Sequence, residues 1–149
     1  MDYDCPYTTD LTLLDDAIFY RFIPSMMVSW EDGNPTIQSR AFGEIGKDRA
    51  ATLGYPEPAT SIAFHDEIIA SGKTVEEVAD LELNQNCGIA KLTVGSVRAI
   101  PLGIGILKDG KTHNPWHGIL FATTRRQLKR EKSALVAAVQ EIVRLPSRP

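Results

Sequence analysis

Two histidines near the C-terminal end of the chain have the residue type and setting for acid–base chemistry. His113 and His117 stand four residues apart in the segment KTHNPWHGIL. A histidine that titrates near neutral pH, beside an arginine that stabilises developing negative charge, is sufficient for phosphodiester cleavage or transfer. The arginine that we expect to act with them is Arg21. His117, His113 and Arg21 are therefore the candidate catalytic residues. The alternative, that His117 is a half-buried residue bonded to a backbone carbonyl, stays open.

The same spacing raises the question of a metal site. On a helix, residues i and i+4 would present two imidazoles on one face as metal ligands. Asn114 and Pro115 lie between the histidines, and proline disfavours helix at the residue before it. No glutamate follows His113, so the metalloprotease pattern is absent. We therefore predict no metal and no cofactor.

A second candidate site is the segment Thr124-Arg125-Arg126-Gln127, which has the pattern of a helix-capping box. Apolar residues then recur at helical spacing from Leu128 to Val143, which predicts a long helix that Pro146 ends. Free N–H groups, the positive end of the helix dipole and two arginines would bind an anion. Thr124, Arg125 and Arg126 are the predicted anion-binding residues. The alternative is an ordinary capped helix.

Charge is unevenly distributed along the chain. From residue 107 onward there are nine Lys or Arg against three Asp or Glu, although the net charge is −3. A basic patch of this kind suits RNA, a nucleotide or an acidic protein partner, which would dock on Arg126, Lys129 and Arg130. The alternative is that these residues coat the solvent face of one helix.

The elements that must position these residues predict an α+β fold. The 149 residues match one domain, 1–149, with residues 1–10 as an N-terminal arm. We expect a mixed or mainly antiparallel sheet of about five strands, with the long C-terminal helix packed on it. Arg21 falls between apolar neighbours on the first strand, so it needs a polar partner if it points inward. The predicted strands are 17–23, 26–30, 36–42, 89–94, 102–107 and 117–122, and the turn Asp32-Gly33 would join 26–30 to 36–42 as a hairpin. The predicted helices are 47–51, 60–70, 74–81 and the C-terminal helix.

Several classes of protein are not expected. The longest run without strongly polar residues, 99–107, is far shorter than the ~20 residues that span a bilayer, so we predict no membrane association. Acidic residues follow Met1, where a secretory signal would be basic. Cys5 and Cys87 form no motif, which favours reduced thiols and a cytoplasmic location. Serine-nucleophile and phosphate-loop signatures are absent.

Short motifs give the chain a resemblance to other proteins. The segments FYRFIP at 19–24, DGNP at 32–35 and NPWH at 114–117 resemble a pattern in small bacterial proteins, and this resemblance implies no activity. The aromatic-Arg pair on the first strand is also similar to the opening of ADP-ribosyltransferase and RES-type toxin domains. The chain departs from those domains because no catalytic glutamate can be placed on a late strand.

The leading hypothesis is a small bacterial cytoplasmic protein that binds or processes a phosphate-bearing ligand, RNA or nucleotide, in a toxin-like role. The alternative is a non-catalytic interaction protein, such as an antitoxin, immunity protein or adaptor, that docks an acidic partner through the basic C-terminal helix.

Overall fold

The fold is built on one six-stranded antiparallel sheet. The computed structural model describes residues 3–83, 87–101, 103–110 and 114–145. Every pairing within the sheet is antiparallel, where the sequence predicted a mixed or mainly antiparallel sheet of about five strands. In spatial order the strands are β6 (Ile104–Lys108), β7 (His117–Ala122), β4 (Thr60–Phe64), β1 (Ile18–Pro24), β5 (Cys87–Thr93) and β8 (Glu141–Leu145).

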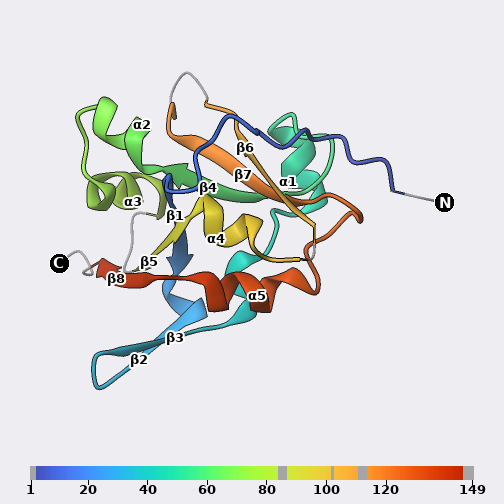
Figure 1. The fold of residues 1–149 in the computed structure, drawn as a ribbon. Coiled ribbons are helices and arrows are strands. Elements are labelled where there is room, and N and C mark those ends of the chain that lie inside the picture. The colour runs from blue at the N-terminus through green and yellow to red at the C-terminus, as the bar shows by residue number, and fades with distance from the viewer. Residues whose placement is uncertain (1–2, 84–86, 102, 111–113, 146–149) are drawn as a thin grey trace.

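A separate hairpin projects from this sheet (Figure 1). Its strands are β2 (Val28–Glu31) and β3 (Asn34–Ile37), and they pair antiparallel. The turn residues Asp32 and Gly33 both have positive φ, at 51° and 80°, which is the geometry that the Asp-Gly signal predicted.

Within the described residues, five α-helices accompany the strands, and most were anticipated from local signals. The reciprocal bonds of the capping box between Thr74 and Glu77 are present at 3.1 and 3.2 Å. Gly72, at φ 74°, follows the helix that it was expected to end. The helices are α1 (Lys47–Thr52), α2 (His65–Ala70), α3 (Val75–Leu83), α4 (Val94–Arg98) and α5 (Glu131–Ala138), and two 3-10 turns cover Ser25–Met27 and Ser39–Phe42.

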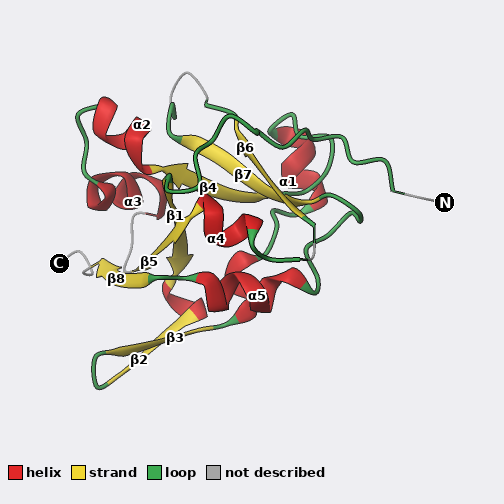
Figure 2. Cartoon of the chain, in the orientation of Figure 1, coloured by secondary structure: helices red, strands yellow, loops and turns green. Residues whose placement is uncertain are grey.

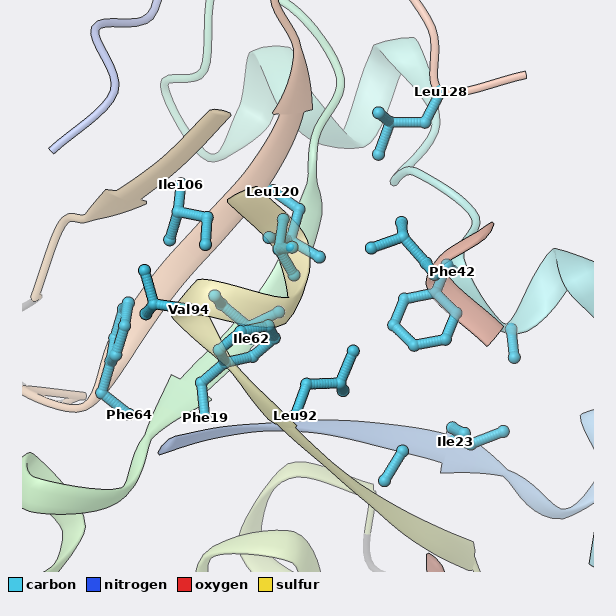
Figure 3. Close-up of a cluster of buried hydrophobic side chains, with 14 of the residues drawn as sticks. Phe19, Ile23, Phe42, Ile62, Phe64, Leu92, Val94, Ile106, Leu120 and Leu128 are labelled. Carbon is cyan, nitrogen blue, oxygen red and sulfur yellow. The ribbon is translucent and has the colours of Figure 1, made fainter. Parts of the chain in front are cut away.

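Helices cover both faces of the sheet, so the core has two main layers. Figure 1 shows the α2–α3 pair on one side of β1 and α4 and α5 on the other. The larger layer packs the second face of the sheet against α4, α5 and the 39–42 turn (Figure 3), and its largest side chains include Phe19, Phe42, Phe64, Leu92 and Leu128. The smaller layer joins the first face to α2 and α3 through Tyr20, Ile68, Val78, Ile89 and Trp116.

A third, small apolar cluster lies on the first face at the β7 end of the sheet. Ile119 and Phe121 of β7 are buried there against Tyr7 of the N-terminal arm and Tyr55. The ring centroids of Tyr7 and Phe121 are 5.1 Å apart. The first face is therefore covered at both ends, by α2 and α3 at one end and by the arm and Tyr55 at the other.

The predicted long C-terminal helix is wrong. Helix α5 has only eight residues, and Ile142 and Val143 belong to strand β8, which pairs with β5. Residues 123–130 form no helix, as the loop between β7 and α5 in Figure 2 shows. Four basic residues in the expected first turns oppose the helix dipole, and the β-branched residues after Ala138 favour a strand.

The predicted helix over 60–70 is also wrong in its first half. Residues Thr60–Phe64 are strand β4, the neighbour of both β1 and β7, and only His65–Ala70 is helical. A short apolar run is ambiguous between a buried strand and a buried helix, and the tertiary pairing decided it here. None of the helices in the described part of the chain has the length and apolar character needed to cross a membrane.

Candidate functional site

The β6–β7 hairpin brings Asp109 and His117 side by side. Asp109 follows the last residue of β6, and its N–H donates to the carbonyl of His117 at 3.2 Å, while the N–H of His117 donates to the carbonyl of Asn114 at 3.0 Å. A Cβ at position 110 would lie 2.8 Å from the carbonyl oxygen of Pro115, so this close approach requires glycine. The backbone of one hairpin therefore fixes both functional side chains.

The side chains of His117 and Asp109 form a short contact. Nδ1 of His117 lies 2.6 Å from Oδ1 of Asp109, and the two side chains are only 13% and 15% exposed. A proton on Nδ1 satisfies the carboxylate and leaves Nε2 as a hydrogen-bond acceptor. The carboxylate thereby sets the orientation of the imidazole.

Tyr55 completes this arrangement on the carboxylate side. Its hydroxyl donates to Oδ2 of Asp109 at 3.1 Å and lies 3.3 Å from Nδ1 of His117. Burial, followed by the nearby charge of Asp109 and the hydrogen bond to it, raises the pKa of Tyr55. Tyr55 therefore remains a protonated donor that holds Asp109 in place.

Ser61 of β4 lies on the opposite side of the imidazole. Its Oγ is 3.4 Å from Nε2 of His117. The register explains this contact: Ala63 pairs with His117, and Ser61 lies two residues along β4 on the same face of the sheet. Asp109, His117 and Ser61 thus form a continuous series of polar contacts.

Among the predicted site residues, Arg21 is the one whose hydrogen bonds and burial tell most about the site. Its Nε donates to the carbonyl of Ala41 at 2.8 Å and its Nη1 to the carbonyl of Ser61 at 3.0 Å. These carbonyls are the polar partners that the sequence required. None of the ion pairs found among the described residues involves Arg21. Burial lowers its pKa to about 10, so the guanidinium is still charged at neutral pH.

A pocket of about 280 Å³ opens where these groups meet. The pairing of β1 with β4 covers Phe19 and Tyr20 only, and Arg21 bonds across the gap beyond it. Two of the lining side chains, Arg21 and Arg49, are cations, and a third, His117, can accept a proton. One lining side chain, Glu82, is a carboxylate. The lining residues are Arg21, Phe22, Ile45, Arg49, Ser61, Ile62, Ala63, Glu82 and His117.

The candidate residues proposed from sequence therefore have different outcomes. His117 and Arg21 line one pocket, whereas His113 lies outside the described residues. Thr124, Arg125 and Arg126 do not begin a helix, so the predicted helix dipole is missing there.

The two arginines of that segment line a different surface hollow, together with Gln127 and Lys129. Each has a carboxylate nearby. Arg125 lies 3.5 Å from the buried Glu131, and Arg126 lies 4.0 Å from Glu57. These partners reduce the positive charge that an incoming anion would meet.

Sequence reasoning missed three contributors to the site. Tyr55, Ser61 and Asp109 were not among the candidate residues. Asp109 and His117 flank the segment between the predicted strands 102–107 and 117–122, and pairing these strands as a hairpin is the signal that would have brought the two residues together. In the described ranges, no three His, Cys, Asp or Glu side chains are grouped so as to hold a metal ion.

Comparison with known proteins assigns the chain to no family. No family model, curated protein or solved structure matches the chain.

Proposed function

We propose that this protein binds a small phosphate-bearing ligand, such as a nucleotide, in the pocket of Arg21 and His117, and that His117 transfers a proton as the ligand is processed. The support comes from the charges in the pocket, its size and the position of the imidazole.

The environment of Arg21 is the observation that carries the proposal. A cation in a low-dielectric setting normally has a carboxylate partner, because desolvation penalises an isolated charge. Among the described residues, Arg21 donates to two backbone carbonyls, through Nε and Nη1, and its guanidinium carries further N–H donors. A phosphate in the adjoining pocket would supply the missing negative charge, and Arg binds phosphate in a planar, bidentate geometry.

The size of the pocket limits the ligand. Ligand pockets commonly enclose ~300–1,000 Å³, and this one, at about 280 Å³, lies at the small end. It suits a single phosphate group with part of its attached alcohol or nucleoside. A longer RNA would have to place one phosphate in the pocket and leave the rest of the strand on the surface.

A calorimetric titration tests the proposal. Inorganic phosphate and nucleoside monophosphates are titrated into the wild type, Arg21→Met, Arg49→Met and the control Arg126→Met. We expect at least ~10-fold weaker binding for both pocket variants, since one charge-assisted contact is worth over 1 kcal/mol. Arg49 lies on the exposed surface of α1, so its variant leaves the carbonyls around Arg21 paired.

The control decides where the ligand binds. Arg126→Met is expected to bind phosphate as the wild type does, because Arg126 belongs to the other hollow. Absence of phosphate and nucleotide binding to the wild type, or weakening by Arg126→Met alone, would contradict the proposal.

The second candidate function is the docking of an acidic protein partner, and one observation favours it. The side chain of Arg126 is 74% exposed, and Lys129 and Arg130 are exposed in the same segment. Charge reversal at these three positions separates the two candidates. Loss of a stoichiometric partner with unchanged phosphate binding would favour the docking function.

A further inference from the structure

The geometry points to Ser61 as a catalytic nucleophile, activated by His117 and Asp109, that takes up a phosphoryl group from a small phosphate monoester. This inference rests on the proposed function and adds to it a reaction, a covalent intermediate and a substrate class.

The contacts around His117 provide the activation. Nδ1 of the imidazole faces Asp109 at 2.6 Å, and Nε2 faces Oγ of Ser61 at 3.4 Å. A nucleophile beside a base that a third group orients is the arrangement by which serine becomes reactive at neutral pH. Such contacts are often long without substrate and shorten when it binds, so 3.4 Å is within the range of a productive pair.

The backbone of Ser61 is held on both sides, which makes its hydroxyl a positioned group. On one side Ser61 pairs with Ile119 of β7, and on the other its carbonyl accepts the hydrogen bond from Arg21. Ser61 and Arg21 both line the pocket. The guanidinium is therefore tied to the backbone of the nucleophile's own residue, and both residues line the pocket in which we place the phosphate.

The charges in the pocket favour a phosphoryl group over an uncharged ester as the electrophile. Phosphoryl transfer spreads negative charge over the equatorial oxygens of the transferred group, and positioned cations stabilise that charge. Arg21 and Arg49 supply two such cations. Glu82 accepts from the indole N–H of Trp116 at 3.3 Å, so a protein donor shares its charge.

The reaction has two balanced steps. First, Oγ of Ser61 attacks phosphorus, its proton passes to Nε2 of His117, and the phosphorus–oxygen bond to the alcohol breaks; His117 then protonates the departing oxygen. This step leaves a phosphoserine. In the second step, water attacks phosphorus and gives its proton to His117, the bond to Oγ breaks, and the proton returns to Ser61 as inorganic phosphate leaves.

The test is covalent labelling of the full chain with an alkyl fluorophosphonate, in which Oγ displaces fluoride from phosphorus. Intact-mass and peptide mass spectrometry then locate the adduct. We expect labelling at Ser61, none at that position in Ser61→Ala, and labelling at least ~10-fold slower in His117→Gln. Ser29→Ala removes an exposed serine from another strand and should label as the wild type does.

Two results would overturn the inference. One is the absence of an adduct at Ser61 in a wild type that binds phosphate, which would leave the proposed function standing. The other is equal labelling rates for the wild type and His117→Gln, with both proteins folded by circular dichroism. Inorganic phosphate should slow the labelling, because it occupies the same pocket.

Phosphate binding by Ser61→Ala separates the two proposals. We expect it to match the wild type, since Arg21 donates to the backbone carbonyl of residue 61, which the variant keeps, and not to its hydroxyl. Labelling of Ser61 in a protein that binds neither phosphate nor nucleotide would overturn the proposed function, and the phosphoryl-transfer step with it.

Discussion

Nδ1 of His117 lies 2.6 Å from Oδ1 of Asp109, at the loop end of the β6–β7 hairpin. The backbone N–H of Asp109 also donates to the carbonyl of His117, so main chain and side chains hold the pair together. Asp109 directly follows β6 and His117 begins β7, so the pairing of these two strands brings them together. A fixed imidazole with one nitrogen turned to a carboxylate has its other nitrogen available for chemistry.

Asp109→Asn should impair labelling of Ser61 far more than it impairs folding. An amide can donate to Nδ1, which would move the ring proton to Nε2 and remove the base. We expect labelling to slow by about 100-fold or more, with a loss of roughly 1 kcal/mol in the free energy of unfolding. Asp32→Asn, in the positive-φ turn of the β2–β3 hairpin, is the control and should leave labelling unchanged. Wild-type labelling in Asp109→Asn would show that the carboxylate does not set the tautomer.

Tyr55→Phe tests whether Tyr55 positions Asp109. Loss of the hydroxyl removes the 3.1 Å bond to Oδ2, so we expect slower labelling and ~1–2 kcal/mol less stability in urea denaturation. Tyr7→Phe is the matched control, because the Tyr7 hydroxyl donates to the backbone carbonyl of Glu57. It should lower stability without slowing the labelling. If both variants slow it equally, Tyr55 has only a structural role.

Glu44→Gln should stabilise the protein at neutral pH. Burial, and then the nearby carboxylates of Glu131 and Glu57, raise the pKa of Glu44, although the N–H of Leu128 and the charge of Lys132 oppose this. Its Oε2 is buried without a hydrogen-bond partner, whereas Oε1 accepts from Leu128 at 2.8 Å. Glutamine keeps that acceptor and carries no charge, so a gain of about 1 kcal/mol is expected.

The pH dependence of this effect has a definite sign. With a raised folded-state pKa, the native state binds more protons than the unfolded state, and wild-type stability falls as pH rises from the ordinary value of 4.5 through the raised one. The advantage of Glu44→Gln should therefore be present at about pH 7 and small at about pH 3.5. Urea denaturation at both pH values, with the exposed Glu31→Gln as control, measures it. An advantage of equal size at both would refute the charge explanation.

Gly118→Ala should destabilise the hairpin that carries the site. An added Cβ would lie 2.3 Å from a ring atom of the buried Phe64 and 2.9 Å from the carbonyl oxygen of Leu107. We expect a loss of about 2 kcal/mol in thermal or urea unfolding. Gly88→Ala is the matched control on β5, where the nearest atoms are side chains at 3.5 Å, and a change within about 0.5 kcal/mol is expected. Equal effects would mean that the contact with Phe64 relaxes at little cost.

The parts of the fold that the sequence predicted are those specified by local patterns. The strand over 17–23 and the Asp-Gly hairpin follow from residue type and turn chemistry, and the structure confirms both as β1 and the β2–β3 pair. The capping box at Thr74 likewise confirms the start of α3. Each of these signals is contained within a few consecutive residues.

The secondary structure of the C-terminal region could not be predicted from local patterns, because tertiary contacts determine it. The apolar residues from 128 to 143 fit a helical period, yet Leu128 is fixed by the carboxylate of Glu44, and Ile142 pairs with Ala90 in the sheet. None of these partners is near in sequence.

The residues of the site also divide into those that residue type could predict and those that depend on tertiary contacts. His117 and Arg21 could be selected by residue type, because an imidazole or a guanidinium beside apolar strand residues suggests a role in binding or proton transfer. Ser61 could not, since its role depends on the register between β4 and β7, which places it two residues from the partner of His117. A central strand that was predicted as a helix could not reveal that register.

Phosphate titration followed by NMR is the most direct test of an anion pocket at Arg21 and His117. The side-chain Nε–H of Arg21, held by the carbonyl of Ala41, and the ring signals of His117 report on the site itself. We expect both to shift with a single binding curve while Arg125 and Arg126 do not respond. Shifts confined to Arg125, Arg126 and Lys129, with Arg21 and His117 unchanged, would contradict it.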